Sequence, residues 1–129
     1  MVKCKAYKIY NDNEKIFGKI EKTKIKDPEE GEVLIKIHYS SVNYKDALAA
    51  TGLGKIIRTY PCIGGIDLAG IVSKSNDKNF KEGDNVLATS YGIGVSQDGG
   101  FSEFATIPAK WVLHVPTGLD LFESMSLGT

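Results

Sequence analysis

The chain has 129 residues, of which 42% are hydrophobic and 25% are charged, a composition typical of one globular domain with a buried core. Sixteen basic residues balance sixteen acidic ones, so the net charge gives no reason to expect nucleic acid or an anionic membrane as a partner. No apolar run approaches the roughly 20 residues of a membrane-spanning helix. The N-terminus lacks the apolar core of a signal peptide, and we therefore expect a cytoplasmic protein.

The first third of the chain predicts β-strands. Residues 4–10 and 17–23 form two strand-like segments around a turn at residues 11–13. The next strand is predicted over Val33–Ser41, where hydrophobic residues at odd-numbered positions alternate with mostly polar ones. This period of two is typical of a half-buried strand.

A short helix is expected to follow, and then two more strands. Asn43 is suited to cap a helix over Tyr44–Ala50, whose alanines favour helix, and a glycine-containing segment ends it. Strands are predicted at Asp67–Ser75 and Asn85–Ala88. Between them, Gly83 is suited to a tight turn because glycine readily adopts a positive φ.

The last part of the chain predicts a loop, two strands and the beginning of a helix. The loop covers residues 89–100, and the strands cover Phe101–Ile107 and Val112–Val115. Short strands at this spacing indicate a barrel or a sandwich. Residues 120–123 have the Asp-x-x-Glu form of a capping box. A helix that opens so close to the last residue has nothing to follow it, so we interpret the sequence as a fragment.

The cysteines and histidines show no metal-binding pattern. Cys4 and Cys62 are too far apart for the usual zinc spacings. A disulfide is not expected in a reducing compartment, and both are expected to be small buried residues. His38 and His114 lie in strand-like segments without a second His or Cys nearby.

Several motifs occur together in one order, and each of them is weak alone. They are Gly31–Lys36, Asn43–Asp46, Gly65–Val72, Phe80–Val86 and Gly99–Ala105. Together they resemble the GroES-like catalytic domain of the medium-chain dehydrogenase/reductase superfamily. Asn43–Asp46, with the later segments Ala88–Tyr91 and Gly94–Ser96, is similar to the YhdH/YhfP group of quinone oxidoreductases, some of which are acrylyl-CoA reductases that use NADPH.

This resemblance implies a mainly β fold, a partly open GroES-like barrel with short helices, over residues 1–119. Residues 120–129 would start the connection to a Rossmann α/β nucleotide-binding domain, which is missing here. Thr129 lies at the start of the family's Gly-Thr segment and is expected to contact the cofactor. No G-x-G-x-x-G fingerprint follows a strand in this chain, so the cofactor phosphates would bind elsewhere.

The resemblance also predicts the loss of zinc. Where zinc-dependent relatives place a cysteine and a histidine, this chain has Asn43 and Ile66. Catalytic zinc takes three Cys, His or carboxylate ligands and an open position, whereas an amide is a poor ligand and isoleucine is none. The loop over residues 89–100 also has no cysteine for a second zinc. We therefore expect an enzyme that binds no zinc.

The resemblance places the turn at residues 43–44 in a cleft that faces the nicotinamide. Tyr44 is thus expected to contact NADPH, and Asn43 and Tyr44 are the candidate catalytic hydrogen-bond donors. Asn43 has a simpler interpretation as a helix cap, and Tyr44 as a ring packed on the barrel. Lys45 and Asp46 are expected behind them as an ion pair. Asp67 lies among apolar residues and needs a partner, such as Lys45 or a bound ligand, because an unpaired buried charge is costly.

These features predict the N-terminal part of an NADPH-dependent, zinc-independent oxidoreductase. Its substrate would be acrylyl-CoA, a similar enoyl thioester, or a quinone. The full-length enzyme is expected to be a cytoplasmic homodimer that acts on small molecules, whereas the fragment alone would be inactive. One alternative is a GroES-like module that binds a partner without catalysis. The other is a zinc alcohol dehydrogenase, against which the residues at the ligand positions argue.

Overall fold

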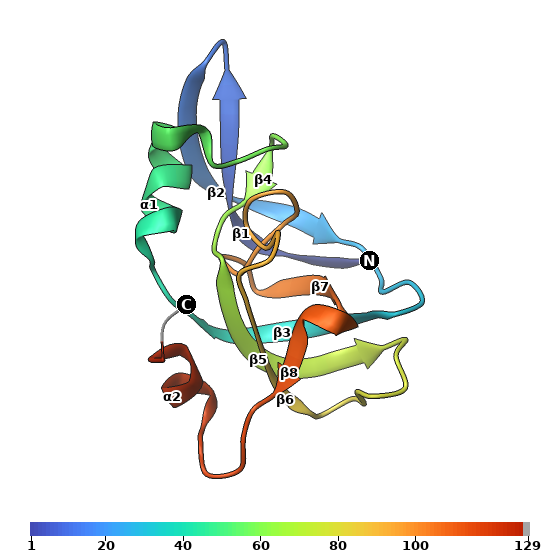
Figure 1. Cartoon of the computed structure of the whole chain (residues 1–129). Coiled ribbons are helices and arrows are strands. Elements are labelled where there is room, and N and C mark those ends of the chain that lie inside the picture. The colour runs from blue at the N-terminus through green and yellow to red at the C-terminus, as the bar shows by residue number, and fades with distance from the viewer. Residues whose placement is uncertain (128–129) are drawn as a thin grey trace.

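The computed structural model describes residues 1–127. Within them the chain forms mostly β-strands, two short α-helices and two single turns of 3-10 helix (Figure 1). The strands are β1 (Val2–Asp12), β2 (Lys15–Ile25), β3 (Glu32–Ser40), β4 (Cys62–Ile63), β5 (Asp67–Ser75), β6 (Asn85–Thr89), β7 (Phe104–Pro108) and β8 (Val112–His114). The helices are α1 (Tyr44–Thr51), η1 (Leu53–Lys55), η2 (Ala109–Trp111) and α2 (Leu121–Met125).

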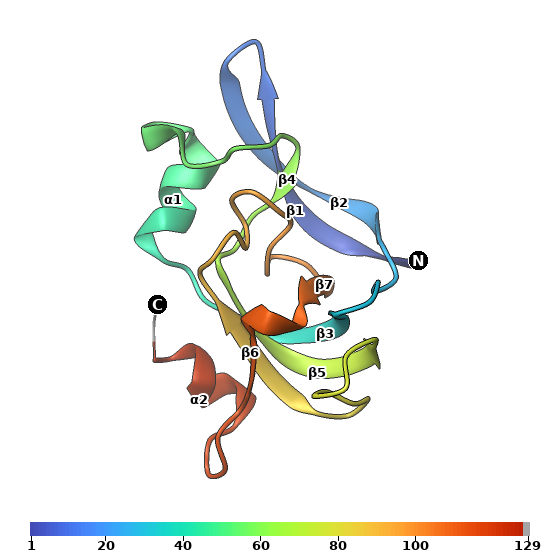
Figure 2. The same cartoon turned by 45° about the vertical axis from the view of Figure 1, so that its right-hand side comes forward.

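The strands form two antiparallel sheets. One has the order β7-β3-β5-β6-β8 and makes a half-barrel, and the other has the order β2-β1-β4. Figure 2 shows the second sheet above the first, with α1 and α2 on the same side of the molecule. This arrangement confirms the mainly β, partly open barrel. The main core fills the half-barrel and is built from buried side chains of its strands, including Val33, Ile35, Leu68, Val72, Val86 and Ile107.

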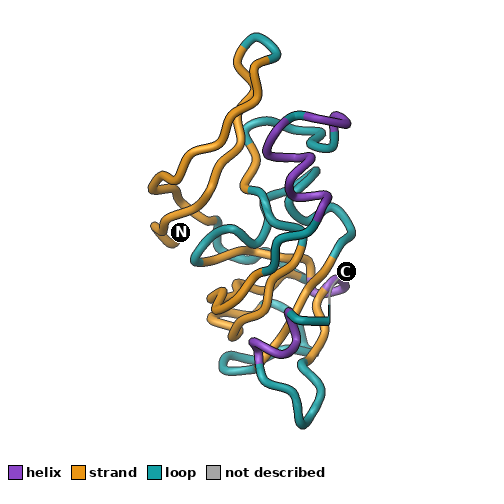
Figure 3. Tube along the Cα trace, turned by 90° about the vertical axis from the view of Figure 1, so that its left-hand side faces the viewer, coloured by secondary structure: helices purple, strands orange, loops and turns teal. Residues whose placement is uncertain are grey.

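The first hairpin is longer than the sequence predicted. Asn11 and Asp12 were expected in the turn, but they continue the ladder, and Asp12 pairs with Lys15. The turn consists of Asn13 and Glu14, with φ of 51° and 67°. Left-handed backbone at both central residues is the geometry of a type I′ turn, whose twist matches that of the strands. The hairpin extends beyond the rest of the chain (Figure 3).

Strand β3 is buried on both faces at its start, in contrast to the half-buried strand that we predicted. Val33, Leu34 and Ile35 each have 0% of their surface exposed. Val33 and Ile35 face the main core, whereas Leu34 packs with Cys4 and other residues against the smaller sheet. A second layer covers the face that the alternation assigned to solvent, which a single strand's pattern cannot reveal.

The local signals around the helices and turns are confirmed. Asn43 is the N-cap of α1, and Asp120 caps α2 by accepting a 2.7 Å hydrogen bond from the Glu123 N–H. Gly83 has a φ of +95°, as its turn requires. Gly65 has a φ of +97°, and a β-carbon there would lie 2.7 Å from the Phe101 backbone nitrogen. The backbone approach at this glycine therefore excludes larger residues.

The other predicted strands differ from those of the structure only at their ends, whereas β4, η1 and η2 were not predicted. Strand β7 begins at Phe104 rather than Phe101, because the Phe101 N–H donates to the Gly64 carbonyl and Ser102 forms only an isolated bridge to Ala6. None of the helices within residues 1–127 has the length and apolar character of a membrane span.

Candidate functional site

The site residues come together where β3 ends and α1 begins. Asn43 has extended backbone, with φ of −114° and ψ of 163°, and α1 starts at the next residue. The Asn43 N–H donates a 2.8 Å hydrogen bond to Asp46 Oδ2. This bond satisfies one of the N–H groups that a helix start leaves without an intrahelical partner.

Asp67, the first residue of β5, is 1% exposed and lies against this turn. Its Oδ2 accepts hydrogen bonds from Ser41 Oγ at 2.7 Å and from Asn43 Nδ2 at 2.9 Å. Asp67 thus has partners, as expected, but they are Ser41 and Asn43, whereas we had predicted Lys45 or a bound ligand. Hydrogen bonds from a hydroxyl and an amide favour a buried carboxylate and offset part of its desolvation.

Asp46 is the second buried carboxylate of the site, with 4% of its surface exposed. Its Oδ1 accepts a 2.9 Å hydrogen bond from the Ile66 N–H, and its Oδ2 is held by the Asn43 N–H. Among residues 1–127, no ion pair joins it to Lys45, whose side chain is exposed. The ion pair that we expected is thus replaced by hydrogen bonds to backbone N–H groups.

The Asn43 amide nitrogen is engaged within the chain. Besides Asp67, it lies 3.3 Å from Ser41 Oγ and 3.3 Å from Asp46 Oδ2. An amide has two N–H groups, and both have acceptors here. In this arrangement, Asn43 fixes the shape of the turn.

Tyr44, in contrast, projects from the turn. It is 80% exposed, and its neighbour Val42 is 81% exposed. Within the described part of the chain, the Tyr44 side chain has no hydrogen bond or ring contact. The alternative that its ring packs on this barrel is therefore wrong. Nearby on the same strand end, Tyr39 is 44% exposed and makes an edge contact with Phe122, at 5.5 Å between ring centroids.

The residues at the zinc-ligand positions do not fit a catalytic zinc. Ile66 is 4% exposed and has no donor atom in its side chain. The Asn43 side chain directs its amide nitrogen at Asp67. This nitrogen donates hydrogen bonds and does not ligate a cation. Over residues 1–127, no three His, Cys, Asp or Glu side chains are grouped so that they could hold a metal ion.

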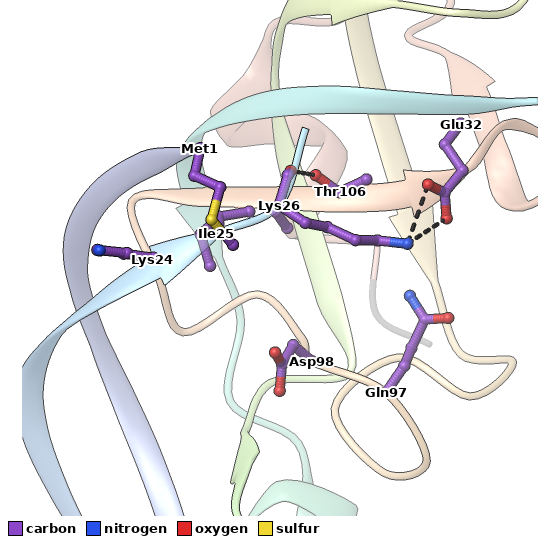
Figure 4. Close-up of a pocket in the computed structure, with 9 residues that line it drawn as sticks. Met1, Lys24, Ile25, Lys26, Glu32, Gln97, Asp98 and Thr106 are labelled. Atoms are coloured by element: carbon purple, nitrogen blue, oxygen red, sulfur yellow. Dashed lines mark hydrogen bonds and ion pairs between the residues drawn. The ribbon is translucent and has the colours of Figure 1, made fainter. Parts of the chain in front are cut away.

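Tyr44 and Val42 offer the kind of surface that one end of a nicotinamide cofactor would need, and their contact with it stays a prediction. An exposed aromatic ring with a hydroxyl, beside exposed Val42, suits a flat ring that carries polar groups. Thr129, the other expected cofactor contact, lies outside the described residues. The hollow in Figure 4 is lined instead by Met1, by residues at the end of β2 and just after it, by the first residue of β3, by β7 and by the loop at Gln97. It contains none of the predicted site residues, and its Lys26 is paired with Glu32 at 3.1 Å.

The sequence profile of the alcohol dehydrogenase GroES-like domain matches residues 29–117. The chain belongs to this family. The match covers every residue of the site described above, from Ser41 to Asp67. The resemblance to the medium-chain dehydrogenase/reductase superfamily is thereby confirmed.

Within this family, the chain is similar to two bacterial oxidoreductases. YhfP of Bacillus subtilis, provisionally named a quinone oxidoreductase, is 55% identical over 102 residues, which are 79% of this chain and 31% of YhfP. Acrylyl-CoA reductase AcuI of Ruegeria pomeroyi is 42% identical over 99 residues, which are 77% of this chain and 30% of AcuI. The chain thus spans about a third of the length of these relatives.

Solved structures agree with the sequence relatives. The yhdH oxidoreductase of Salmonella enterica, in complex with NADP, has a TM-score of 0.91 and 39% identity, and the match covers 96% of this chain and 38% of that one. YhfP of Bacillus subtilis, with NAD bound, also has a TM-score of 0.91, with 42% identity over 99% of this chain and 39% of YhfP. The GroES-like barrel of this chain therefore matches those of two structures that carry nicotinamide cofactors.

Two parts of the site were missed by reasoning from the sequence. Neither the Ser41 hydroxyl nor the Ile66 backbone N–H was expected to hold a carboxylate. The Asn-x-x-Asp spacing from Asn43 to Asp46 did carry a signal for the first turn of α1. The contacts to Ile66 and Asp67 have no such signal, because these residues lie about twenty positions further along the sequence and meet the turn only in the folded chain.

Proposed function

We propose that this chain is the GroES-like domain of a zinc-independent, NADPH-dependent oxidoreductase that reduces an activated carbon–carbon double bond. Acrylyl-CoA or a similar enoyl thioester is the proposed substrate, and a quinone is the second. The observation that carries the proposal is the turn at Asn43 and Tyr44. Two buried carboxylates hold this turn, Asp46 through the Asn43 backbone N–H and Asp67 through the Asn43 side-chain amide, while the Tyr44 side chain is left 80% exposed.

When bound, NADPH would supply the hydride that the β-carbon of the enoyl thioester accepts and would leave as NADP⁺, and the α-carbon would take up a proton. Negative charge develops on the thioester oxygen during this reduction. In a zinc enzyme the metal would stabilise such an oxygen as a Lewis acid. Here Tyr44 is the proposed donor to the cofactor or to that oxygen, because preorganised donors stabilise developing charge.

Asn43 has a different part in this proposal from the one that the resemblance implied. Its amide protons are directed at Asp67, Ser41 and Asp46, so we assign it the task of holding the turn. Asp46 and Asp67 support Asn43 in turn. Tyr44 then remains the proposed contact with the reacting groups.

The rest of the cofactor site is proposed to lie in a Rossmann domain that follows residue 129. Residues 1–119 would be the barrel domain and residues 120–129 the start of the connection. Helix α2, at the start of this connection, is anchored on the half-barrel, where Leu121 and Met125 pack with Ala69 and Leu87. The exposed surface around Tyr44 would then face the second domain across the cleft.

The test is a comparison of two proteins, the full-length enzyme and the 129-residue chain. We expect the full-length enzyme to oxidise NADPH with acrylyl-CoA or a quinone and the 129-residue chain to be inactive, because it holds only one wall of the site. Assays with NADH in place of NADPH measure the cofactor preference. Equal specific activity of the two proteins would show that the cofactor site has been misplaced.

A further inference from the structure

Asp46 joins two segments of the site that are distant in the sequence. Its Oδ2 accepts the Asn43 N–H at 2.8 Å, and its Oδ1 accepts the Ile66 N–H at 2.9 Å. With 4% of its surface exposed, this carboxylate is screened from water. Hydrogen bonds to a buried carboxylate are short and strong, so the two segments are held firmly to each other.

Helix capping accounts for only half of this arrangement. The bond to Asn43 is the one that a residue at the third position of a helix commonly makes. The bond to Ile66 reaches a turn twenty residues further along the chain, and it contributes nothing to the first turn of α1. A cap alone would leave that second carboxylate oxygen facing water.

Tyr44 depends on this backbone for its position. Its side chain has no hydrogen bond or ring contact within residues 1–127 and is 80% exposed. The backbone at Asn43 and Tyr44 therefore sets the direction of the Tyr44 Cα–Cβ bond, from which the ring extends. Groups that act on a substrate must be held to within about 0.5 Å of the productive geometry, and here the adjoining N–H is fixed by Asp46.

We propose that Asp46 is the positioning residue of this site, which holds the turn with Tyr44 against the turn with Ile66. Asn43 and Ile66 are the two residues that stand at zinc-ligand positions of the metal-bearing relatives. A metal would join those positions through side chains, whereas Asp46 joins them through backbone N–H groups. Asp46 is buried and acts on the reaction only through Tyr44, so its catalytic consequence rests on the proposed function.

The first test needs no activity and uses the 129-residue chain. Asp46→Asn keeps the shape of the side chain but turns an N–H₂ group toward one of the two backbone N–H donors. We expect the amide order parameter of Tyr44, measured by NMR relaxation, to fall from about 0.85 to below about 0.6. Hydrogen exchange at the Ile66 amide should become faster in the same variant.

Asp84→Asn is the matched control. Asp84 also accepts a backbone N–H, that of Lys81 at 3.0 Å, but in the turn before β6. The Asp84→Asn variant should leave the order parameter of Tyr44 unchanged. An unchanged order parameter of Tyr44 in Asp46→Asn, or an equal fall of that order parameter in both variants, would overturn the proposal. If Asp46→Asn does not fold, Asp46→Glu replaces it, since the longer arm cannot reach both N–H groups in the same geometry.

The second test is a double-mutant cycle in the full-length enzyme. Asp46→Asn should lower kcat/KM roughly tenfold or more, since a displacement of about 1 Å can cost two orders of magnitude in rate. In the Tyr44→Ala background, the same change should lower kcat/KM by no more than about twofold. Ile107→Val, a core change far from the turn, controls for lost stability. Equal losses in both backgrounds would show that Asp46 does not act through Tyr44.

The two tests separate this inference from the proposed function. A full-length wild-type protein that binds no NADPH would defeat the proposed function, while the NMR result would still decide whether Asp46 positions Tyr44. A wild-type enzyme that is active, with an Asp46→Asn variant that loses only thermal stability, would defeat the inference and leave the proposed function standing.

Discussion

The Asn43 amide nitrogen lies 2.9 Å from Asp67 Oδ2, and this bond ties the start of α1 to the start of β5. Asn43 belongs to the turn from which Tyr44 projects, and the buried Asp67 lies against this turn. The strand ends supply rigid support, and the turn supplies the exposed group. The site is therefore built on elements that packing already fixes, which favours precise placement of a catalytic group.

The bond between Asn43 and Asp67 predicts a loss of stability in Asn43→Ala. Removing the donor leaves a buried carboxylate with one hydrogen bond fewer, which should cost roughly 1–3 kcal/mol in the free energy of unfolding. The exposed Asn85 is the control, because Asn85→Ala should change that free energy by less than about 0.5 kcal/mol. Urea titration of both variants measures the difference, and equal midpoints would refute the role of this bond.

Tyr44→Ala should change cofactor binding and leave the fold intact. Because the ring is 80% exposed, the free energy of unfolding should change by less than about 0.5 kcal/mol. Loss of a hydrogen bond worth roughly 0.5–1.5 kcal/mol should raise the Kd for NADPH several-fold, with lost ring contact adding to this. Thermal melting and cofactor titration of the full-length variant measure the two effects.

The control for that variant is Ile20→Ala. Ile20 is 74% exposed on β2 and lies outside the site, so its removal should alter neither melting nor NADPH affinity. A Tyr44→Ala protein with a much lower melting temperature and an unchanged Kd would reject a contact between Tyr44 and the cofactor.

Zinc removal should have no effect on the full-length enzyme. Asn43 and Ile66 offer no thiolate or imidazole at the ligand positions, so metal analysis should give well under one zinc per chain. Activity after dialysis against a chelator should match that before it. Stoichiometric zinc that survives chelation, or activity restored only by added zinc, would contradict the proposed zinc independence.

Cys62 should be unreactive in the native protein. Burial raises the pKa of its thiol to about 12, and the nearby Asp98 carboxylate adds to this increase. The thiol form is thus retained in the folded state, whereas the unfolded thiol ionises near its ordinary pKa of about 8.5. Its contribution to stability is fully present below that pKa and is lost as pH rises toward 12.

A thiol reagent at pH 8 tests this directly. Only unfolded protein should react at Cys62, so the labelling rate should rise steeply in denaturant. Rapid modification without denaturant would show that the site opens far more readily than its 2% exposure indicates.

Local sequence signals predicted much of the fold. The caps at Asn43 and Asp120, the positive φ of Gly83 and the extent of β5 all follow from residues that lie next to one another. The burial of Leu34 does not, because it depends on a sheet that reaches β3 from a distant part of the chain. Alternation of hydrophobic residues reports one buried face and is silent about a second layer.

The candidate site, like the fold, could be predicted from the sequence only in part. Resemblance located Asn43 and Tyr44, and the chemistry of a buried charge required a partner for Asp67. The identity of that partner depended on where Ser41 and Asn43 meet β5, and this is set by the register between β3 and β5. The exposure of Tyr44 likewise follows from packing and could not be decided from its residue type, since a tyrosine serves equally well in a core or at an interface.

Transfer of deuterium from NADPH labelled at the nicotinamide C4 position tests the central claim most directly. The full-length enzyme, incubated with acrylyl-CoA and this cofactor, should form one propionyl-CoA for each NADPH oxidised, with the deuterium on the β-carbon. A quinone substrate should likewise be reduced with one NADPH consumed for each quinone. No oxidation of NADPH with either substrate, in a folded protein at saturating cofactor, would contradict the assignment of this chain to a zinc-independent NADPH-dependent oxidoreductase.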